Sequence, residues 1–189
     1  MIIEVRILSR GGQGGVTGAK LLAQTGHLGN KFVQAIPKYG AERKGAPIFA
    51  DIRIADEEIK THAPVIAGNT HSFIILENSD EIVCQIPFEE INKDTIIVVN
   101  SPDIPPSLRG MKFKIGIVDA ISISQECGLI KSGTALVSTI MLGAWIKATS
   151  LLKLETLEKA ITLKFGSTDI AKRNIKAIKM AYDQFKFVN

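Results

Sequence analysis

Residues 6–24 read RILSRGGQGGVTGAKLLAQ, and this stretch decides the fold because it joins a strand, a glycine-rich turn and the start of a helix. The apolar run over residues 2–8 predicts the strand. Apolar residues within 16–23 begin the helix, which the pattern ends near Gly26 or Gly29. A strand-to-helix turn of this kind suits a phosphate, because the N–H groups at a helix start favour an anion.

Beyond this stretch, the chain alternates between further strands and helices. The expected strands are residues 2–8, 31–36, 48–55, 72–78, 95–101 and 112–120, and the expected C-terminal helices are residues 134–149, 154–165 and 171–185. Strands that alternate with helices indicate an α/β fold. We therefore expect a Rossmann-like, mostly parallel sheet flanked by helices, with a helical C-terminal part, in a single domain over residues 1–189.

Length and charge narrow the class of protein. A chain of 189 residues buries about 70% of its unfolded surface, so it needs no disulfide or metal to fold. The net charge is +4, with a denser basic cluster at Lys38, Arg43, Lys44 and Arg53. Nucleic-acid binders usually show basic runs with interleaved aromatic residues, and this chain has neither. A basic cleft for an anionic small molecule, or for an acidic partner protein, fits better.

The cysteines and the apolar runs bear on metals, membranes and compartment. Cys84 and Cys127 lie in apolar surroundings and cannot supply the three or four ligands of a zinc or iron–sulfur site. The longest apolar stretch, residues 134–146, is shorter than the roughly 20 residues that span a membrane. The first residues enter a strand directly and do not resemble a signal peptide. We expect a cytoplasmic protein with reduced cysteines, without membrane attachment.

Neither standard nucleotide motif occurs in the glycine-rich turn. The dinucleotide fingerprint needs glycines at its first, third and sixth positions, and a count from Gly12 gives Gly14 and then Thr17. The phosphate-loop motif GxxxxGK is also missing. The glycines still let the backbone bend sharply and let another group approach its N–H donors closely. Two interpretations stay open, an anion site or a tight turn packed against a neighbouring chain.

A second loop, YGAERKGAP over residues 39–47, combines glycines, a proline and charged side chains. In a doubly wound sheet this loop would lie near the same edge as the glycine-rich turn. Arg43 and Lys44 would suit a phosphate or a carboxylate. The alternative is a solvated surface turn.

No residue of the chain is assigned to catalysis. The three histidines, His27, His62 and His71, show no triad spacing with a nucleophile or a carboxylate. The acidic run over residues 56–58 follows a strand and is typical of a solvated turn.

Taken together, three segments resemble a known family. They are RGGQGGVTGAKLLA at residues 10–23, PKYGAERKGAP at 37–47 and VSTIMLGAWIK at 137–147. In order and spacing they resemble the gamma subunit of pyruvate:ferredoxin oxidoreductase and related 2-oxoacid:acceptor oxidoreductases. The chain departs from that pattern at Ser138, where an asparagine is expected, and by the additional glycine Gly15.

The resemblance implies a subunit of an enzyme that oxidatively decarboxylates a 2-oxo acid to an acyl-coenzyme A and passes electrons to ferredoxin. Alpha, beta and delta-type subunits would be its partners, and they would hold the thiamine diphosphate and the iron–sulfur clusters. This chain alone would bind no cofactor and would not be active alone. The form ERKGAP, residues 42–47, is closer to the pyruvate branch than to the 2-oxoglutarate branch.

The resemblance also gives the glycine-rich turn a candidate ligand, the phosphates of coenzyme A. The candidate contact residues are Gly12, Gln13, Gly14, Gly15, Thr17, Arg43 and Lys44. Two other classes of function stay open, an independent nucleotide- or anion-binding protein and a scaffold subunit that binds no ligand. The apolar helix expected over residues 134–149 fits either a half-exposed subunit interface or the centre of the domain.

Overall fold

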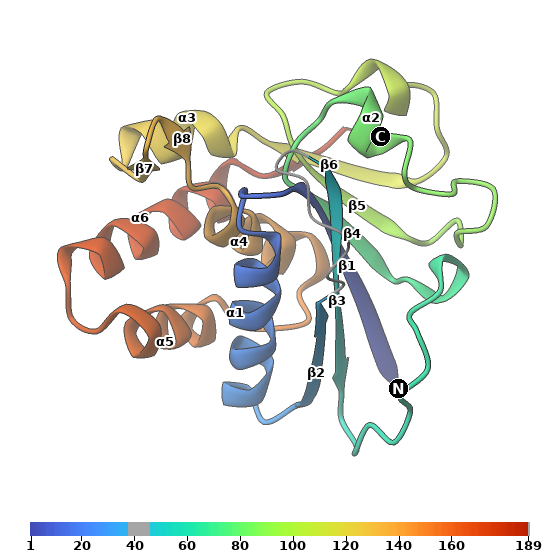
Figure 1. The fold of residues 1–189 in the computed structure, drawn as a ribbon, viewed down its shortest axis with the longest axis horizontal. Coiled ribbons are helices and arrows are strands. Elements are labelled where there is room, and N and C mark those ends of the chain that lie inside the picture. The colour runs from blue at the N-terminus through green and yellow to red at the C-terminus, as the bar shows by residue number, and fades with distance from the viewer. Residues whose placement is uncertain (38–45, 189) are drawn as a thin grey trace.

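The computed structural model describes residues 1–37 and 46–188, and a seven-stranded sheet runs through its centre (Figure 1). The strand order is β2-β3-β1-β4-β5-β6-β9. The strands are β1 (Ile2–Arg10), β2 (Phe32–Pro37), β3 (Pro47–Ala55), β4 (Ser72–Ile75), β5 (Ile96–Asn100), β6 (Lys114–Val118) and β9 (Lys186–Phe187).

Most strands of this sheet point in one direction. Strand β1 pairs in parallel with β4, β4 with β5, and β5 with β6. Strand β3 is antiparallel to both β1 and β2, so β2 runs the same way as β1. Only β3 and β9 run the opposite way among the sheet's described strands. The expected mostly parallel sheet is therefore confirmed.

Three short strands were not expected from the sequence. Besides β9, they are β7 (Ile130–Lys131) and β8 (Thr134–Ala135), which pair as a small hairpin. Strands of two residues are too short to show an alternating pattern. Because Thr134 and Ala135 belong to this hairpin, the helix expected from residue 134 begins only at Ser138.

Most of the helices lie on one face of the sheet. The helices of the structure are α1 (Gly15–Leu28), α2 (Asp80–Val83), α3 (Ala120–Glu126), α4 (Ser138–Thr149), α5 (Leu154–Phe165) and α6 (Asp169–Gln184), with 3-10 turns at η1 (Ala67–Asn69) and η2 (Pro106–Leu108). Figure 1 shows α1, α4, α5 and α6 together on one side of the sheet. Loops with the short helix α2 cover the other side, over a second apolar cluster.

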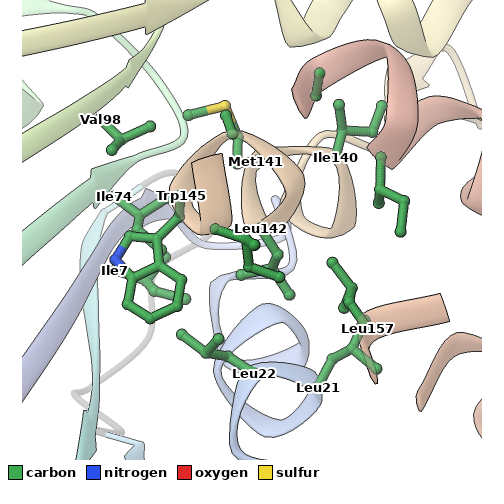
Figure 2. Packing of buried hydrophobic residues seen from close by; sticks show 14 of the residues in the cluster. Ile7, Leu21, Leu22, Ile74, Val98, Ile140, Met141, Leu142, Trp145 and Leu157 are labelled. Atoms are coloured by element: carbon green, nitrogen blue, oxygen red, sulfur yellow. The ribbon is translucent and has the colours of Figure 1, made fainter. Parts of the chain in front are cut away.

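Helix α4 is the centre of the larger core. Figure 2 shows Trp145 of this helix lying against Ile7 and Ile74 of the sheet. Its indole N–H donates a hydrogen bond of 2.7 Å to the Ser72 hydroxyl, and the Trp145 side chain is fully buried. Met141 is also fully buried within this chain. The helix is thus central to the domain, and the half-exposed subunit interface does not hold for it.

Two buried ion pairs join β1 to β3 on the face that the loops cover. Arg6 and Asp51 are directly opposite each other and form two hydrogen bonds, of 2.6 and 3.0 Å. Glu4 and Arg53 form the next pair, joined by one bond of 2.8 Å. The polar face of β3 is therefore covered, and Arg53 belongs to an ion pair and not to a basic surface cluster.

The crossing of α4 and α6 depends on Gly143. A Cβ atom on Gly143 would lie 2.3 Å from the carbonyl oxygen of Ile178 on α6. We expect Gly143→Ala to lower the free energy of unfolding by about 1–3 kcal/mol or more, because the helices must move apart. Urea denaturation of the wild type and the variant measures this difference.

Gly18→Ala in α1 is the matched control for this substitution. The nearest atoms to a Cβ on Gly18 lie at 3.5 Å, an ordinary contact, and alanine favours a helix over glycine by about 0.8–1 kcal/mol. We expect this variant to keep or slightly raise the free energy of unfolding. A Gly143→Ala chain as stable as the wild type would contradict the close crossing.

Candidate functional site

The glycine-rich turn connects the carboxyl end of β1 to the start of α1. Gly12 and Gly14 have φ angles of 96° and 83°, in the left-handed region that side chains disfavour. Gly14 caps the helix without a side-chain hydrogen bond, and the first turn of α1 contains no acidic residue. The positive end of the helix dipole is therefore not compensated by a side chain of its own first turn.

The glycines of this segment differ in what surrounds them. A Cβ on Gly15 would lie 2.3 Å from the Ser9 hydroxyl, and one on Gly14 would lie 2.9 Å from the Ser138 hydroxyl. These two glycines let α1 approach β1 and α4 within the same chain. Around Gly12 no described atom lies within 4 Å of a Cβ position. Gly12 is exposed and leaves its side of the turn open.

A network of polar side chains holds the glycine-rich turn in place. The backbone N–H of Arg10 donates to Gln13 Oε1 at 2.8 Å, and Gln13 Nε2 donates to Glu77 at 2.6 Å. The Arg10 guanidinium donates to the other Glu77 oxygen at 2.7 Å and to Glu81 at 2.7 Å. Gln13 is thus engaged in holding the turn. Arg10 and Glu77 belong to the site, although no sequence motif pointed to either residue.

The network sets the charge of the Glu77 carboxyl. Burial by itself raises the pKa of Glu77, but hydrogen bonds from Arg10, Ser79 and Gln13, with the charge of Arg10, outweigh burial and lower it. The carboxylate is therefore ionised at neutral pH and is matched by the Arg10 guanidinium. An anion at the turn would meet a carboxylate whose charge is already compensated.

Of the remaining predicted contact residues, the structure describes only Thr17. Thr17 is exposed in the first turn of α1. Arg43 and Lys44 lie outside the described residues. The residue after that segment, Ala46, accepts a 3.1 Å hydrogen bond from the Gly11 N–H, and the next residue, Pro47, pairs with Arg10. The second loop therefore leads into β3 directly beside the glycine-rich turn.

The described part of the chain contains no group of three or more histidine, cysteine, aspartate or glutamate residues that could hold a metal ion. Cys127 is buried, and burial raises the pKa of its thiol, as in an unreactive cysteine. His71 accepts a hydrogen bond from the Glu4 N–H at 3.1 Å. Over residues 1–37 and 46–188, no helix is both long and apolar enough to cross a bilayer.

Fold and site together define an α/β domain that offers an open glycine turn at the carboxyl edge of a largely parallel sheet. Residues 4–184 match the pyruvate ferredoxin/flavodoxin oxidoreductase family. The chain belongs to this family.

Two relatives span nearly its whole length. The common gamma subunit of the pyruvate/ketoisovalerate oxidoreductases of Pyrococcus furiosus is 34% identical over 187 residues, 97% of either chain. Pyruvate synthase subunit PorC of Methanothermobacter thermautotrophicus is 32% identical, over 98% of this chain and 97% of that one. Both relatives are named as subunits.

Solved structures agree with the fold. The pyruvate oxidoreductase subunit PORC of Thermotoga maritima is similar with a TM-score of 0.81 and 30% identity, over 100% of this chain and 99% of that one. The 2-oxoglutarate:ferredoxin oxidoreductase of Magnetococcus marinus matches with a TM-score of 0.79 and 17% identity, over 97% of this chain and 31% of that longer chain. The second match shows the shared fold.

The lowered pKa of Glu77 makes the stability of the site depend on pH. Because its pKa is lower when folded, its contribution is complete above the ordinary value of 4.5 and is lost as pH falls through the folded value. We expect Glu77→Gln to lower the free energy of unfolding by about 1 kcal/mol at pH 7, and by less at pH 3. Urea denaturation at both pH values measures this.

Glu81→Gln provides the control, because the Glu81 side chain is 59% exposed and also bonds Arg10. We expect it to change stability by less than about 0.5 kcal/mol at either pH. An effect of Glu77→Gln that stays equal from pH 7 to pH 3 would show that the ionised carboxylate is not what stabilises the turn.

Proposed function

We propose that this chain is the gamma-type subunit of a 2-oxoacid:ferredoxin oxidoreductase, with pyruvate as the substrate of the complex. The complex would oxidatively decarboxylate the 2-oxo acid, transfer the acyl group to coenzyme A and pass the electrons to ferredoxin. One observation carries the proposal: the chain is 34% identical to a subunit named gamma, over 97% of both chains. The sequence form ERKGAP at residues 42–47 favours pyruvate.

The proposed role of this chain is to complete the complex, without carrying out the central chemistry itself. Alpha, beta and delta-type subunits are the proposed partners, and they would hold the thiamine diphosphate and the iron–sulfur clusters. The two cysteines of this chain support this division, because Cys84 is exposed, Cys127 is buried, and a cluster needs more ligands than two. We propose that the complex is cytoplasmic.

The proposed contact with coenzyme A lies at the glycine-rich turn. The amides of Gly12, Gly14 and Gly15 and the hydroxyl of Thr17 would donate to phosphate oxygens, and Arg43 and Lys44 would supply positive charge. Three features support this: no described atom lies within 4 Å of a Cβ position on Gly12, the start of α1 has no side-chain cap, and the Ala46 carbonyl oxygen accepts from the Gly11 N–H. The Gln13 N–H already donates to the Arg10 carbonyl oxygen at 3.1 Å. Gln13 would act through the turn that it braces.

The subunit role is tested by co-purification. We expect the tagged chain, isolated from its native host, to bring chains with thiamine-binding and iron–sulfur motifs, and the purified material to oxidise pyruvate only when coenzyme A is present. Mass spectrometry and a ferredoxin-reduction assay are the measurements. A solitary chain without this activity would contradict the proposal and favour an independent anion-binding protein.

The coenzyme A contact is tested by a double substitution, Arg43→Ala with Lys44→Ala. A lost charge-assisted hydrogen bond costs about 1.5–3 kcal/mol, so we expect the KM for coenzyme A to rise at least about tenfold, with the KM for pyruvate unchanged. The matched control, Lys159→Ala with Lys172→Ala, removes the same charge from exposed positions on α5 and α6. Equal KM values for coenzyme A in both variants and the wild type would rule out the contact.

A further inference from the structure

A cavity of about 720 Å³ opens at the other edge of the sheet, where β1 and β4 begin. Among the residues that line it are Glu4 and Arg53 from the sheet, His71 immediately before β4, and Asp94 before β5. Residues 61–70 supply much of its wall. The cavity lies at the amino ends of β1, β4 and β5, whereas the glycine-rich turn follows the carboxyl end of β1. It is therefore a separate feature of the molecule.

One carboxylate oxygen in this wall has no partner. Glu4 Oε2 is buried and makes no hydrogen bond to any described residue. Water does not replace the missing partner readily, because the Glu4 side chain is only 10% exposed. The other oxygen, Oε1, accepts from Arg53 Nε. A buried acceptor without a donor is costly, so such a group calls for a partner from outside the chain.

The neighbouring ion pair between β1 and β3 does not leave an oxygen unbonded in this way. Two positions along β1 from Glu4, Arg6 donates to both carboxylate oxygens of Asp51. Arg53 instead turns its remaining donors to Gln34 Oε1 and to the carbonyl oxygen of Ala63. Arg53 therefore does not bond Glu4 Oε2, which stays without a donor in a residue of the cavity wall.

The charges and the rim of the cavity indicate what would enter. Glu4 and Asp94 outnumber the single guanidinium of Arg53, so the lining is acidic in a chain whose net charge is +4. Exposed apolar side chains stand at the same end of the molecule, with Ile66 58% exposed and Ile2 38% exposed. A negatively charged centre inside an apolar rim is complementary to a cationic side chain that projects from an apolar protein surface.

We propose that this cavity is a docking site for a lysine or arginine side chain of a partner subunit, whose nitrogen donates to Glu4 Oε2 while apolar residues beside it pack on Ile2 and Ile66. This inference rests on the proposed function, because it assigns the partner to the assembled oxidoreductase. A protein segment fits better than a small cation alone, since the apolar rim extends to the exposed Met1, beyond the cavity lining.

The test reconstitutes the complex from the separately purified gamma chain and its partner chains, and measures the affinity of assembly. Ile66→Lys places a positive charge at the rim, at a position that is 58% exposed, so the lysine side chain can extend into solvent. We expect it to weaken assembly at least tenfold. Leu163→Lys on α5, where the leucine is 65% exposed on the helical side, is the matched control and should assemble like the wild type.

A second variant addresses the carboxylate itself. Glu4→Gln keeps the shape of the side chain and removes its charge, and we expect assembly to weaken at least tenfold in protein whose circular dichroism spectrum is that of the wild type. Assembly of Ile66→Lys within twofold of the wild type overturns the inference while the proposed function stands. If the wild-type chain assembles with no partner, the proposed function fails, and this inference fails with it.

Discussion

The close approach of helix α1 to strand β1 and to the start of α4 is the constraint on which the candidate site depends. Side chains larger than hydrogen at Gly14 and Gly15 would run into the hydroxyl groups of Ser138 and Ser9. With these contacts satisfied, the turn is fixed between β1 and α1, and the helix start faces the carboxyl edge of the sheet. Packing and anion binding are therefore not rival explanations of the glycines, because Gly14 and Gly15 serve the packing while Gly12 leaves the turn open.

The antiparallel pairing of strand β3 with β1 positions the second loop. Its two buried ion pairs with β1 fix a register in which Pro47 lies opposite Arg10. Only with this register does Ala46 meet Gly11, so that the second loop of the chain ends beside the first. The same pairs leave Glu4 with one oxygen unmatched at the opposite edge. The proposed ligand contact and the proposed docking site therefore depend on one pairing of strands.

The expected strands and the place of the glycine-rich turn followed from apolar runs and from glycine spacing, which are local signals. The roles of individual residues did not, because they depend on residues far apart in the chain. Arg10 bonds Glu77, which lies 67 positions further along the chain, and the polar face of β3 is buried only because Glu4 and Arg6 lie opposite it.

The choice between the two alternatives for the apolar helix, a subunit interface or the centre of the domain, was open for the same reason: α1, α5, α6 and the sheet enclose α4. Hydrophobicity on all sides of a helix cannot distinguish a partner chain from the rest of its own domain.

We propose that the turn between β1 and α1 holds the phosphates of coenzyme A inside an assembled oxidoreductase. The most direct measurement is a cryo-electron microscopy structure of the complex, purified from its host through this chain and saturated with coenzyme A. We expect phosphate density within about 3 Å of backbone N–H groups among Gly12 and residues 14–17. Coenzyme A bound in the complex with its phosphates away from this turn would contradict the claim.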